Sequence, residues 1–446
     1  MAALTAIDPD AFEASLWWQT ARTGAAFPIL SGSRRADVAV VGAGIAGLST
    51  ALHLAEKGID VVVLEAGEPG FEATGRSGGI IAPDFVLHSP LTVQRKFGAG
   101  QGERFARLVG GSARFVFDLI GRHDIDCDVQ ANGFLWPAHN MKTVRIQKQR
   151  QADWARLGFD VACLSAPEAA RLVGSRRYLG ALLYRDGGAI NPLAFARGLA
   201  TATVGLGGAV FAHSPVTMPE KTARGWRLRT AEGEVTAPRL ILAANGGNAA
   251  LHPALRRTIV PLHVYEYATA PLAPRLKRKI LVEGHALTDK QRYMFTARFD
   301  GAGRLISGFP SFLLHRDRQR ILREATRRLG HFFPSLADVE VAHLWRGTAW
   351  LNSSLLPALY DLADGALAIQ ACNGRGLALN AALGQEVADW LASGAKTALS
   401  VPLQAPRPFA VHAVAKYLPD VLMAATRSLA CTGTSLDRVK GRAVDD

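Results

Sequence analysis

Val40-Val-Gly-Ala-Gly-Ile-Ala-Gly47 is the stretch that decides the fold of this chain. It overlaps Asp37-Val-Ala-Val-Val41, an apolar run typical of a buried parallel strand. Its glycines fit the pattern G-x-G-x-x-G: Gly42 permits a tight turn, Gly44 lets the backbone approach a pyrophosphate, and Gly47 lets the following helix pack against the strand. The stretch therefore predicts a strand, a glycine turn and a helix that bind a dinucleotide.

The residues that follow complete a strand-helix-strand unit. Apolar residues recur at helical spacing from Ile45 to Ala55, and Asp60-Val-Val-Val-Leu64 predicts the second strand. Glu65 ends that strand about 20 positions after the first glycines, where an acid binds ribose hydroxyls. The cofactor contacts expected from this unit are Gly42, Gly44, Ile45, Ala46, Gly47, Glu65 and Ala66.

Two later glycine turns suggest a ligand longer than NAD. Thr74-Gly-Arg-Ser-Gly-Gly79 lies close to the first unit, whereas Ala371-Cys-Asn-Gly-Arg-Gly376 lies near the opposite end of the chain. Both suit close backbone approach to a ligand, and the second opens a helix whose free N–H groups attract negative charge. FAD is long enough to need both. The further predicted contacts are Arg76, Ser77, Gly78, Gly79, Val216, Asn245, Gly246, Gly374, Arg375, Gly376 and Leu377.

Length and composition agree with a large globular enzyme. The 446 residues exceed one simple core, and 49% hydrophobic and 20% charged residues are ordinary for this class. We expect no integral membrane segment, because no apolar run is long enough and no signal pattern opens the chain. The four cysteines form no C-x-x-C pair, which predicts no metal site and a reducing cytoplasmic location. The net charge of +13 is dispersed, and no nucleic-acid module is visible.

The order of the patterns predicts an α/β fold with two discontinuous domains. A Rossmann-like FAD-binding domain with a parallel sheet is expected from residues 34–95, 186–257 and 341–446, after an N-terminal arm at 1–33. A substrate domain with a mostly antiparallel sheet is expected from residues 96–185 and 258–340. The strands before Gly42, Asn245 and Gly374 should share the parallel sheet, because ligands bind at the carboxyl ends of such strands.

The same motifs resemble the D-amino-acid oxidase-type flavoprotein family, in the branch that includes gamma-glutamylputrescine oxidoreductase. The resemblance covers about Ser15 to Leu391. It rests on Ser15-Leu-Trp-Trp18, the region 36–49, Thr74 to Gly79, Ala243-Ala-Asn245, Thr269-Ala-Pro-Leu272 and Cys372-Asn-Gly-Arg-Gly376. Arg375 stands where the family commonly has histidine, Cys372 where it has tyrosine, Ser77 where it has asparagine, and Ala270 where it has glutamate. The resemblance implies bound FAD and leaves the substrate and electron acceptor open.

Oxidation of an amine by a flavin needs positioning and desolvation more than acid–base groups. The candidate catalytic residues are Arg375, Arg298, Tyr293 and Trp345. Arg375 would stabilise the anionic reduced flavin, and Arg298 could hold a substrate carboxylate through two hydrogen bonds. Tyr265 and Tyr267 are further wall candidates, and Glu266 and His263 are possible bases that strand alternation could equally place in solvent. Each aromatic could instead be ordinary packing, Arg76 a surface salt bridge, and Arg375 a solvent-facing turn residue.

Three functions stay open. The first is FAD-dependent oxidation of an amine or amino acid to an imine, with hydride transfer to flavin N5, later hydrolysis, and O2, a quinone or a protein as the electron acceptor. The second is oxidation of a 2-hydroxy acid or polyol phosphate, and the third is a non-catalytic or RNA-linked flavoprotein.

Gly347-Thr348-Ala349 resembles a region where some relatives attach FAD, but it has no cysteine, so we expect non-covalent FAD.

Overall fold

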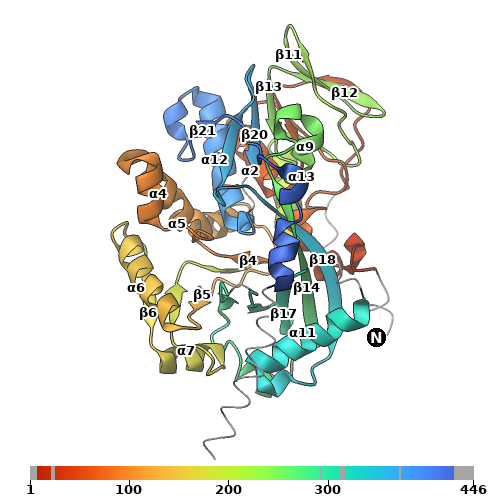
Figure 1. The fold of residues 1–446 in the computed structure, drawn as a ribbon. Helices are drawn as coiled ribbons and strands as arrows, with labels where there is room; N and C mark the ends of the chain where they lie inside the picture. Colours follow the sequence, from red (N-terminus) through yellow and green to blue (C-terminus); the bar gives the residue numbers. More distant parts are fainter. Residues whose placement is uncertain (1–7, 22–25, 292, 312–316, 371–372, 426–446) are drawn as a thin grey trace, which may run out of the picture.

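The computed structural model describes residues 8–21, 26–291, 293–311, 317–370 and 373–425. Its centre is a seven-stranded sheet in the order β21-β19-β20-β13-β2-β3-β9 (Figure 1). Five neighbouring strands are parallel: β20 (Ala366–Gln370), β13 (Arg239–Leu242), β2 (Val38–Val41), β3 (Val61–Leu64) and β9 (Ala209–Phe211). The prediction that the strands before Gly42, Asn245 and Gly374 share one parallel sheet is therefore confirmed.

Alternating side chains of the parallel sheet pack on two different layers. Val38 and Val40 of β2 join the helical core, whereas Ala39 and Val41 join a second core under a four-stranded sheet. That small sheet has the order β1-β12-β11-β10, and its strands are Gly32–Arg35, Gly233–Ala237, Gly225–Arg229 and Glu220–Thr222. The parallel sheet is consequently covered on both faces, as its unbroken apolar strands require.

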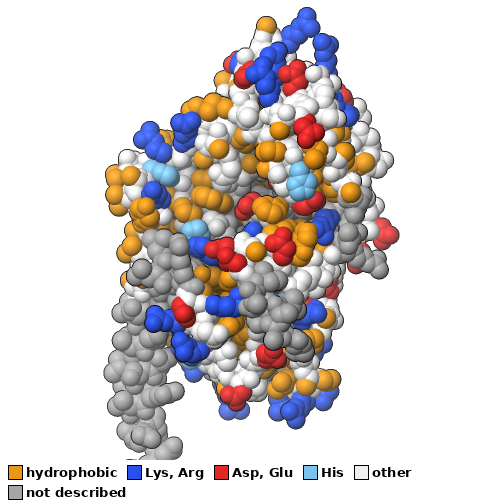
Figure 2. Space-filling model, turned by 90° about the vertical axis from the view of Figure 1, so that its right-hand side faces the viewer, with side chains coloured by type: hydrophobic (Ala, Val, Ile, Leu, Met, Phe, Trp, Pro, Cys, Tyr) orange, Lys and Arg blue, Asp and Glu red, His pale blue; other side chains and the backbone are white. Residues whose placement is uncertain are grey.

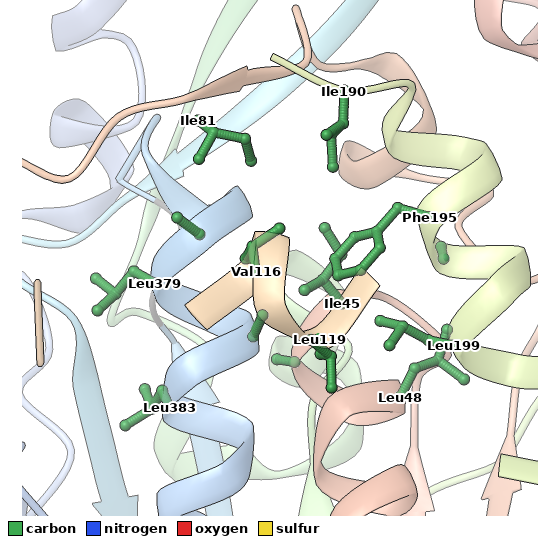
Figure 3. Close-up of a cluster of buried hydrophobic side chains, with 14 of the residues drawn as sticks. Ile45, Leu48, Ile81, Val116, Leu119, Ile190, Phe195, Leu199, Leu379 and Leu383 are labelled. Atoms are coloured by element: carbon green, nitrogen blue, oxygen red, sulfur yellow. The ribbon is translucent and has the colours of Figure 1, made fainter. Parts of the chain in front are cut away.

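Four helices form the other layer: α2 (Ile45–Glu56), α5 (Ala99–Arg122), α8 (Pro192–Gly205) and α12 (Gly376–Ser393). Their apolar stripes meet in one cluster, in which Leu48, Val116, Leu199 and Leu383 come from the four helices in turn (Figure 3). Gly384 lets α12 approach α2 closely, since a methyl group there would lie 2.7 Å from Cβ of Ser49. The two helices that follow the first and third glycine turns are thereby packed together.

A second, eight-stranded sheet has the order β18-β14-β17-β16-β15-β5-β7-β6. All its pairs are antiparallel except β5 with β15. The strands are β5 (Phe134–Pro137), β6 (Val161–Leu164), β7 (Ala181–Tyr184), β14 (Val260–Pro271), β15 (Ala286–Thr288), β16 (Thr296–Phe299), β17 (Arg304–Pro310) and β18 (Val341–Leu351). The sheet therefore continues to Leu351, past the predicted domain boundary at residue 340; the rest of the domain division stays a prediction.

Helix α11 (Arg318–Phe332) covers the outer face of this sheet, at the bottom of Figure 1. Its buried residues Ile321, Ala325 and Leu329 pack on the tyrosines and phenylalanines of the strands. The remaining helices include α4 (Pro90–Phe97), α6 (Met141–Ala155), α7 (Ala166–Val173) and, near the C-terminus, α13 (His412–Ala415).

Candidate functional site

The first glycine turn has the geometry that its sequence predicts. Gly42 has φ +107°, and a methyl group there would lie 2.9 Å from backbone atoms of Ala243 on the next strand. A methyl group on Gly47 would clash with the Gly42 carbonyl oxygen. At Gly44, by contrast, the only described atom near such a methyl is Thr74 Oγ1, 3.5 Å away. Gly42 and Gly47 thus serve the turn and the packing of α2, whereas Gly44 leaves one side of the turn open.

The N-terminus of α2 meets this open side. Gly44 is its cap and no side chain caps the helix, so the first-turn N–H groups of Ile45 and Ala46 are available to an anion. Glu65, at the end of the adjacent strand β3, accepts hydrogen bonds from the N–H groups of Ala43 (2.7 Å) and Gly67 (2.9 Å). Burial raises the pKa of Glu65, and these hydrogen bonds oppose the rise.

Ala66 and Val216 lie beside Glu65 in the fold. Ala66 is the next residue, and Val216 follows strand β9, which pairs with β3. The N–H of Ser214, on the segment leading to Val216, donates to the Glu65 carbonyl oxygen at 2.7 Å. The predicted residues of the first unit are therefore together at one edge of the parallel sheet.

The second glycine turn is held by its carbonyl oxygens. Those of Arg76, Ser77 and Gly78 accept hydrogen bonds from Trp345 Nε1 (2.9 Å), Trp17 Nε1 (2.7 Å) and Arg298 Nε (2.7 Å). The carbonyl oxygen of a trans peptide points away from the N–H of the next residue. The N–H groups of Gly78 and Gly79 consequently point away from Trp17 and Arg298.

Three predicted site residues thus act on this loop in ways that the sequence did not indicate. The Arg76 guanidinium donates to the carbonyl oxygens of Asp10 (2.9 Å) and Arg346 (3.2 Å) and so contacts the N-terminal arm and β18; its contact with FAD stays a prediction. Arg298 also donates to the Ile190 carbonyl oxygen at 2.9 Å. These bonds hold the loop against the sheet, and the role of Arg298 toward a substrate carboxylate stays a prediction. Trp345 is fully buried and also holds the loop, and its role in the substrate site stays a prediction.

The tyrosine candidates lie on the side of the antiparallel sheet that packs against α11. Tyr265, Tyr267 and Tyr293 belong to the core between this sheet and α11, and the Arg328 guanidinium lies 4.2 Å from the Tyr293 ring centroid. Tyr265 and Tyr267 share this face because they are two positions apart on β14, whereas Tyr293 lies in the turn before β16. Tyr293 thus packs in this core, and its role as a wall of the substrate site stays a prediction.

Glu266 points to the other face, the one that meets the glycine loop. It pairs in register with Gly308 on β17 and Trp345 on β18. Its carboxylate would lie 3.2 Å from a methyl group on Gly78 and 2.5 Å from one on Gly308. Gly78 therefore accommodates the Glu266 side chain, and Gly79 accommodates Arg298, whose Cζ would lie 3.0 Å from a methyl group there. His263 contacts Thr348 Oγ1 at 3.1 Å.

The third glycine turn carries Arg375 toward a buried charged cluster. Asp84 accepts hydrogen bonds from Arg150 (2.6 Å) and Lys290 (2.5 Å), and Arg375 adds a third positive charge nearby. Burial raises the Asp84 pKa, but the three cations outweigh it and lower the pKa to about 2. Burial lowers the pKa of Lys290 to about 7, although Asp84 opposes this. No sequence pattern indicates this cluster, because its members come from separate segments.

Arg375 itself is not a solvent-facing turn residue. Its Cζ lies 5.1 Å from the Phe134 ring centroid, and its Nη1 is buried with no hydrogen-bond partner among the described residues. It caps α12, whose first turn, with Gly376 and Leu377, has no side-chain cap. Gly374 has φ +76°, and a methyl group there would have no described atom within 4 Å. Ala371 and Cys372 of this motif lie outside the described residues.

Asn245 and Gly246 lie in the 3-10 turn after strand β13, but Asn248 fixes this turn. Its Oδ1 accepts from the Ala244 N–H at 2.9 Å, and its Nδ2 donates to the carbonyl oxygens of Leu242 and Ile369. Asn248 therefore ties β13 to β20. Asn245 has φ +49°, and the Trp350 ring packs on Gly246.

The chain is similar to known proteins over most of its length. Residues 37–390 match the family model described as FAD dependent oxidoreductase. The protein belongs to this family. Gamma-glutamylputrescine oxidoreductase of Escherichia coli (strain K12) is 32% identical to this FAD-dependent oxidoreductase, over 86% of this chain and 89% of the relative. Probable oxidoreductase OrdL of Rhizobium meliloti (strain 1021) is 27% identical, over 84% and 87%.

Solved structures give the same fold. Glycine oxidase from Geobacillus kaustophilus has a TM-score of 0.67 at 20% identity, over 80% of this chain and 95% of that one. L-proline dehydrogenase from P. horikoshii has a TM-score of 0.69 at 17% identity, over 81% and 94%. The predicted family, fold class and FAD cofactor are confirmed for this FAD-dependent oxidoreductase.

The residues present fit FAD. The open side of Gly44, the uncapped N-termini of α2 and α12, and the outward N–H groups of Gly78 and Gly79 are all suited to a ligand rich in acceptor oxygens. Within the described residues, no cluster of histidine, cysteine or carboxylate side chains could hold a metal ion, and no helix is both long and apolar enough to cross a membrane. Of the cysteines in that part, Cys127 and Cys163 are free.

Proposed function

We propose that the protein oxidises the C–N bond of an amine or amino acid to an imine, which water then hydrolyses. The observation that carries this proposal is the direct contact of one face of the antiparallel sheet with the second glycine turn, through the hydrogen bonds of Trp345 and Arg298. A loop fixed against the sheet in this way would offer a rigid surface on which a C–H bond could be oriented. The name of the E. coli relative supports an amine as the substrate.

The bound FAD would supply the electron acceptor for this oxidation. The first turn of α2 and Glu65 would hold its pyrophosphate and ribose, with Ala66 and Val216 alongside. Gly78 and Gly79 would offer N–H groups, and Arg375 a positive charge, from opposite ends of the chain. Asn245, Gly246, Gly374, Gly376 and Leu377 would line the same sheet edge.

We further propose that FAD is held without a covalent bond. Gly347 lies beside the second turn, since a methyl group there would be 3.1 Å from the Arg76 carbonyl oxygen, and neither it nor Thr348 or Ala349 can form a thioether. Acid precipitation of the purified protein should release the yellow colour into the supernatant. Colour retained in the pellet would refute non-covalent binding.

On the same basis we propose a small-molecule amine or amino acid as the substrate and O2, a quinone or a protein as the electron acceptor. We propose the cytoplasm as the location. On the face shown in Figure 2, Lys and Arg side chains are dispersed among acidic and hydrophobic ones. The expectation of no nucleic-acid partner stays a prediction.

Anaerobic mixing with candidate substrates tests the proposed function. Bleaching of the flavin by amines or amino acids is the expected result. Bleaching by 2-hydroxy acids or polyol phosphates alone would establish the second function instead, and no bleaching by any of them would favour a non-catalytic or RNA-linked role. The acceptor follows from whether O2 or a quinone restores the colour.

A further inference from the structure

We propose that Glu266 binds the ammonium group of the substrate and takes from it the proton that must leave before oxidation. This inference rests on the proposed function and adds a catalytic residue to it. Amines of ordinary basicity, with a pKa near that of lysine at about 10.4, reach a neutral solution protonated. An ammonium group has no lone pair to assist the loss of hydride from its carbon, so a proton acceptor is needed.

The position of Glu266 suits this role. It lies midway along β14, on the sheet face that contacts the second glycine turn, and its carboxylate fills the space beside Gly78 and Gly308. Any side chain at either glycine would displace it. The acid is thereby placed between the sheet and the loop that carries the outward N–H groups.

Glu266 is a buried acid with unused hydrogen-bonding capacity. Only 8% of the residue is exposed, and Oε2 has no hydrogen-bond partner among the described residues. A buried polar atom left unpaired costs about 1–3 kcal/mol, more when charged, so such an atom indicates a ligand that completes it. An ammonium donor would supply both the missing hydrogen bond and the missing charge.

The side chains around Glu266 do not supply another partner for the negative charge of its carboxylate. Arg298 on β16 is the charged group that faces it, but its Nε and Nη2 are directed at the carbonyl oxygens of Gly78 and Ile190. Gly308 and Trp345, its neighbours in register, carry no charge, and Tyr267 points to the opposite face. Burial raises the pKa of Glu266 to about 8, although Arg298 lowers it. Its carboxylate form, which prevails above that pH, is a far better proton acceptor than a solvent-exposed carboxylate.

The proton and electron balance is complete. Proton transfer from the substrate ammonium group to the Glu266 carboxylate gives the neutral amine and the Glu266 carboxylic acid. The C–H bond next to nitrogen then breaks with loss of a hydride, for which bound FAD would supply the two-electron acceptor. The nitrogen lone pair meanwhile forms the C=N bond of a protonated imine. Water converts this product to a carbonyl compound and ammonium, and Glu266 returns its proton to solvent.

The test compares the holoenzyme with Glu266→Gln, which keeps the shape of the side chain and removes its basicity. Glu386→Gln is the matched control. Glu386 is a partly buried carboxylate of α12 that lies outside this site and accepts a hydrogen bond from the Ser400 hydroxyl. Infrared spectra across pH report the protonated carboxyl group independently of turnover. We expect a carboxyl band that titrates near pH 8 in the parent and in Glu386→Gln and is absent from Glu266→Gln.

Kinetics with the amine that bleaches the parent fastest supply the second measurement. In the parent, kcat/KM should fall as the pH drops below about 8, and Glu266→Gln should lose this pH dependence. The KM of Glu266→Gln should be at least tenfold higher (about 1.4 kcal/mol). An unchanged pH dependence and KM, or no titrating band, would make Glu266 a structural acid and overturn the proposal. If no amine or amino acid reduces the parent flavin, the proposed function itself has failed, and the role of Glu266 fails with it.

Discussion

The indole Nε1 of Trp17 donates a 2.7 Å hydrogen bond to the carbonyl oxygen of Ser77, so the N-terminal arm forms part of the second glycine turn. The arm is anchored in turn by Ser15, whose hydroxyl donates to the Gly75 carbonyl oxygen at 2.8 Å. The Trp17 ring also packs edge-on against Trp345, with centroids 5.9 Å apart. The orientation of the loop thus depends on residues that precede the nucleotide-binding unit.

Replacement of Trp17 by Phe should therefore weaken both the fold and cofactor binding. It leaves the Ser77 carbonyl oxygen without its donor, which costs about 1–3 kcal/mol. Chemical denaturation and FAD titration measure the two effects. Trp18→Phe is the control, because Trp18 is 37% exposed; equal losses in both variants would show that the Ser77 bond has no special role.

Gly44→Ala should fold and fail to hold FAD. The backbone of Gly44 is extended (φ −80°), and the nearest described atom to the new methyl is Thr74 Oγ1 at 3.5 Å, so the apoprotein tolerates it. The methyl would fill the open side where the pyrophosphate is expected. We expect a nearly unchanged apoprotein melting temperature and an FAD Kd at least about tenfold higher, or 1.4 kcal/mol. Gly111→Ala is the control: on α5 the new methyl would have no described atom within 4 Å, so the FAD Kd should stay unchanged, while the melting temperature should rise slightly because alanine favours a helix interior.

Arg375→Met should make the flavin harder to reduce. A fixed positive charge in a partly water-excluded site stabilises an anionic reduced ring, and the Met variant lacks it. The two-electron potential should fall, by on the order of 30 mV for each 1.4 kcal/mol lost, while FAD affinity changes less. The exposed Arg145→Met serves as the control. An unaltered potential with unaltered turnover would show that Arg375 serves only the Asp84 cluster.

Asp84→Asn should be the most destabilising of these changes. It removes the carboxylate that compensates Arg150, Lys290 and Arg375, and loss of one partner of a buried pair costs about 3–5 kcal/mol. The folded pKa of Asp84 is depressed to about 2, so its contribution is complete above the unfolded value of about 3.9 and declines as pH falls toward 2. The gap between parent and variant in free energy of unfolding should narrow over that window. Asp118→Asn, exposed on α5, should show no such gap.

The elements with strong periodic patterns could be predicted from sequence. The unit from β2 to Glu65 and the three parallel strands lie where the apolar runs and glycines indicate them. Side-chain direction was harder: β14 is twelve residues long with a register shift near Ala268, so alternation alone could not say whether Glu266 or Tyr267 faces the site.

The roles of Arg76, Arg298 and Trp345 were missed for a different reason. Their partners are backbone carbonyl oxygens, which every residue has and which leave no mark in a sequence. Asp84, Arg150, Lys290 and Arg375 likewise carry no common motif, because four separate segments bring them together. The sequence could predict the dinucleotide site, then, but not the contacts that hold its second turn.

The order of strands in the parallel sheet has a consequence for biosynthesis. β20 pairs with β13, and α12 packs on α2, so the cofactor site joins residues from both ends of the chain. While the ribosome is still making the chain, β2, α2 and β3 emerge long before Arg375 and the helix that follows it. A nascent chain stopped before β20 has the first glycine turn but not the third. The complete set of predicted cofactor contacts therefore exists only after Arg375 has been made, and the apolar face of α2 has no α12 to pack on until then.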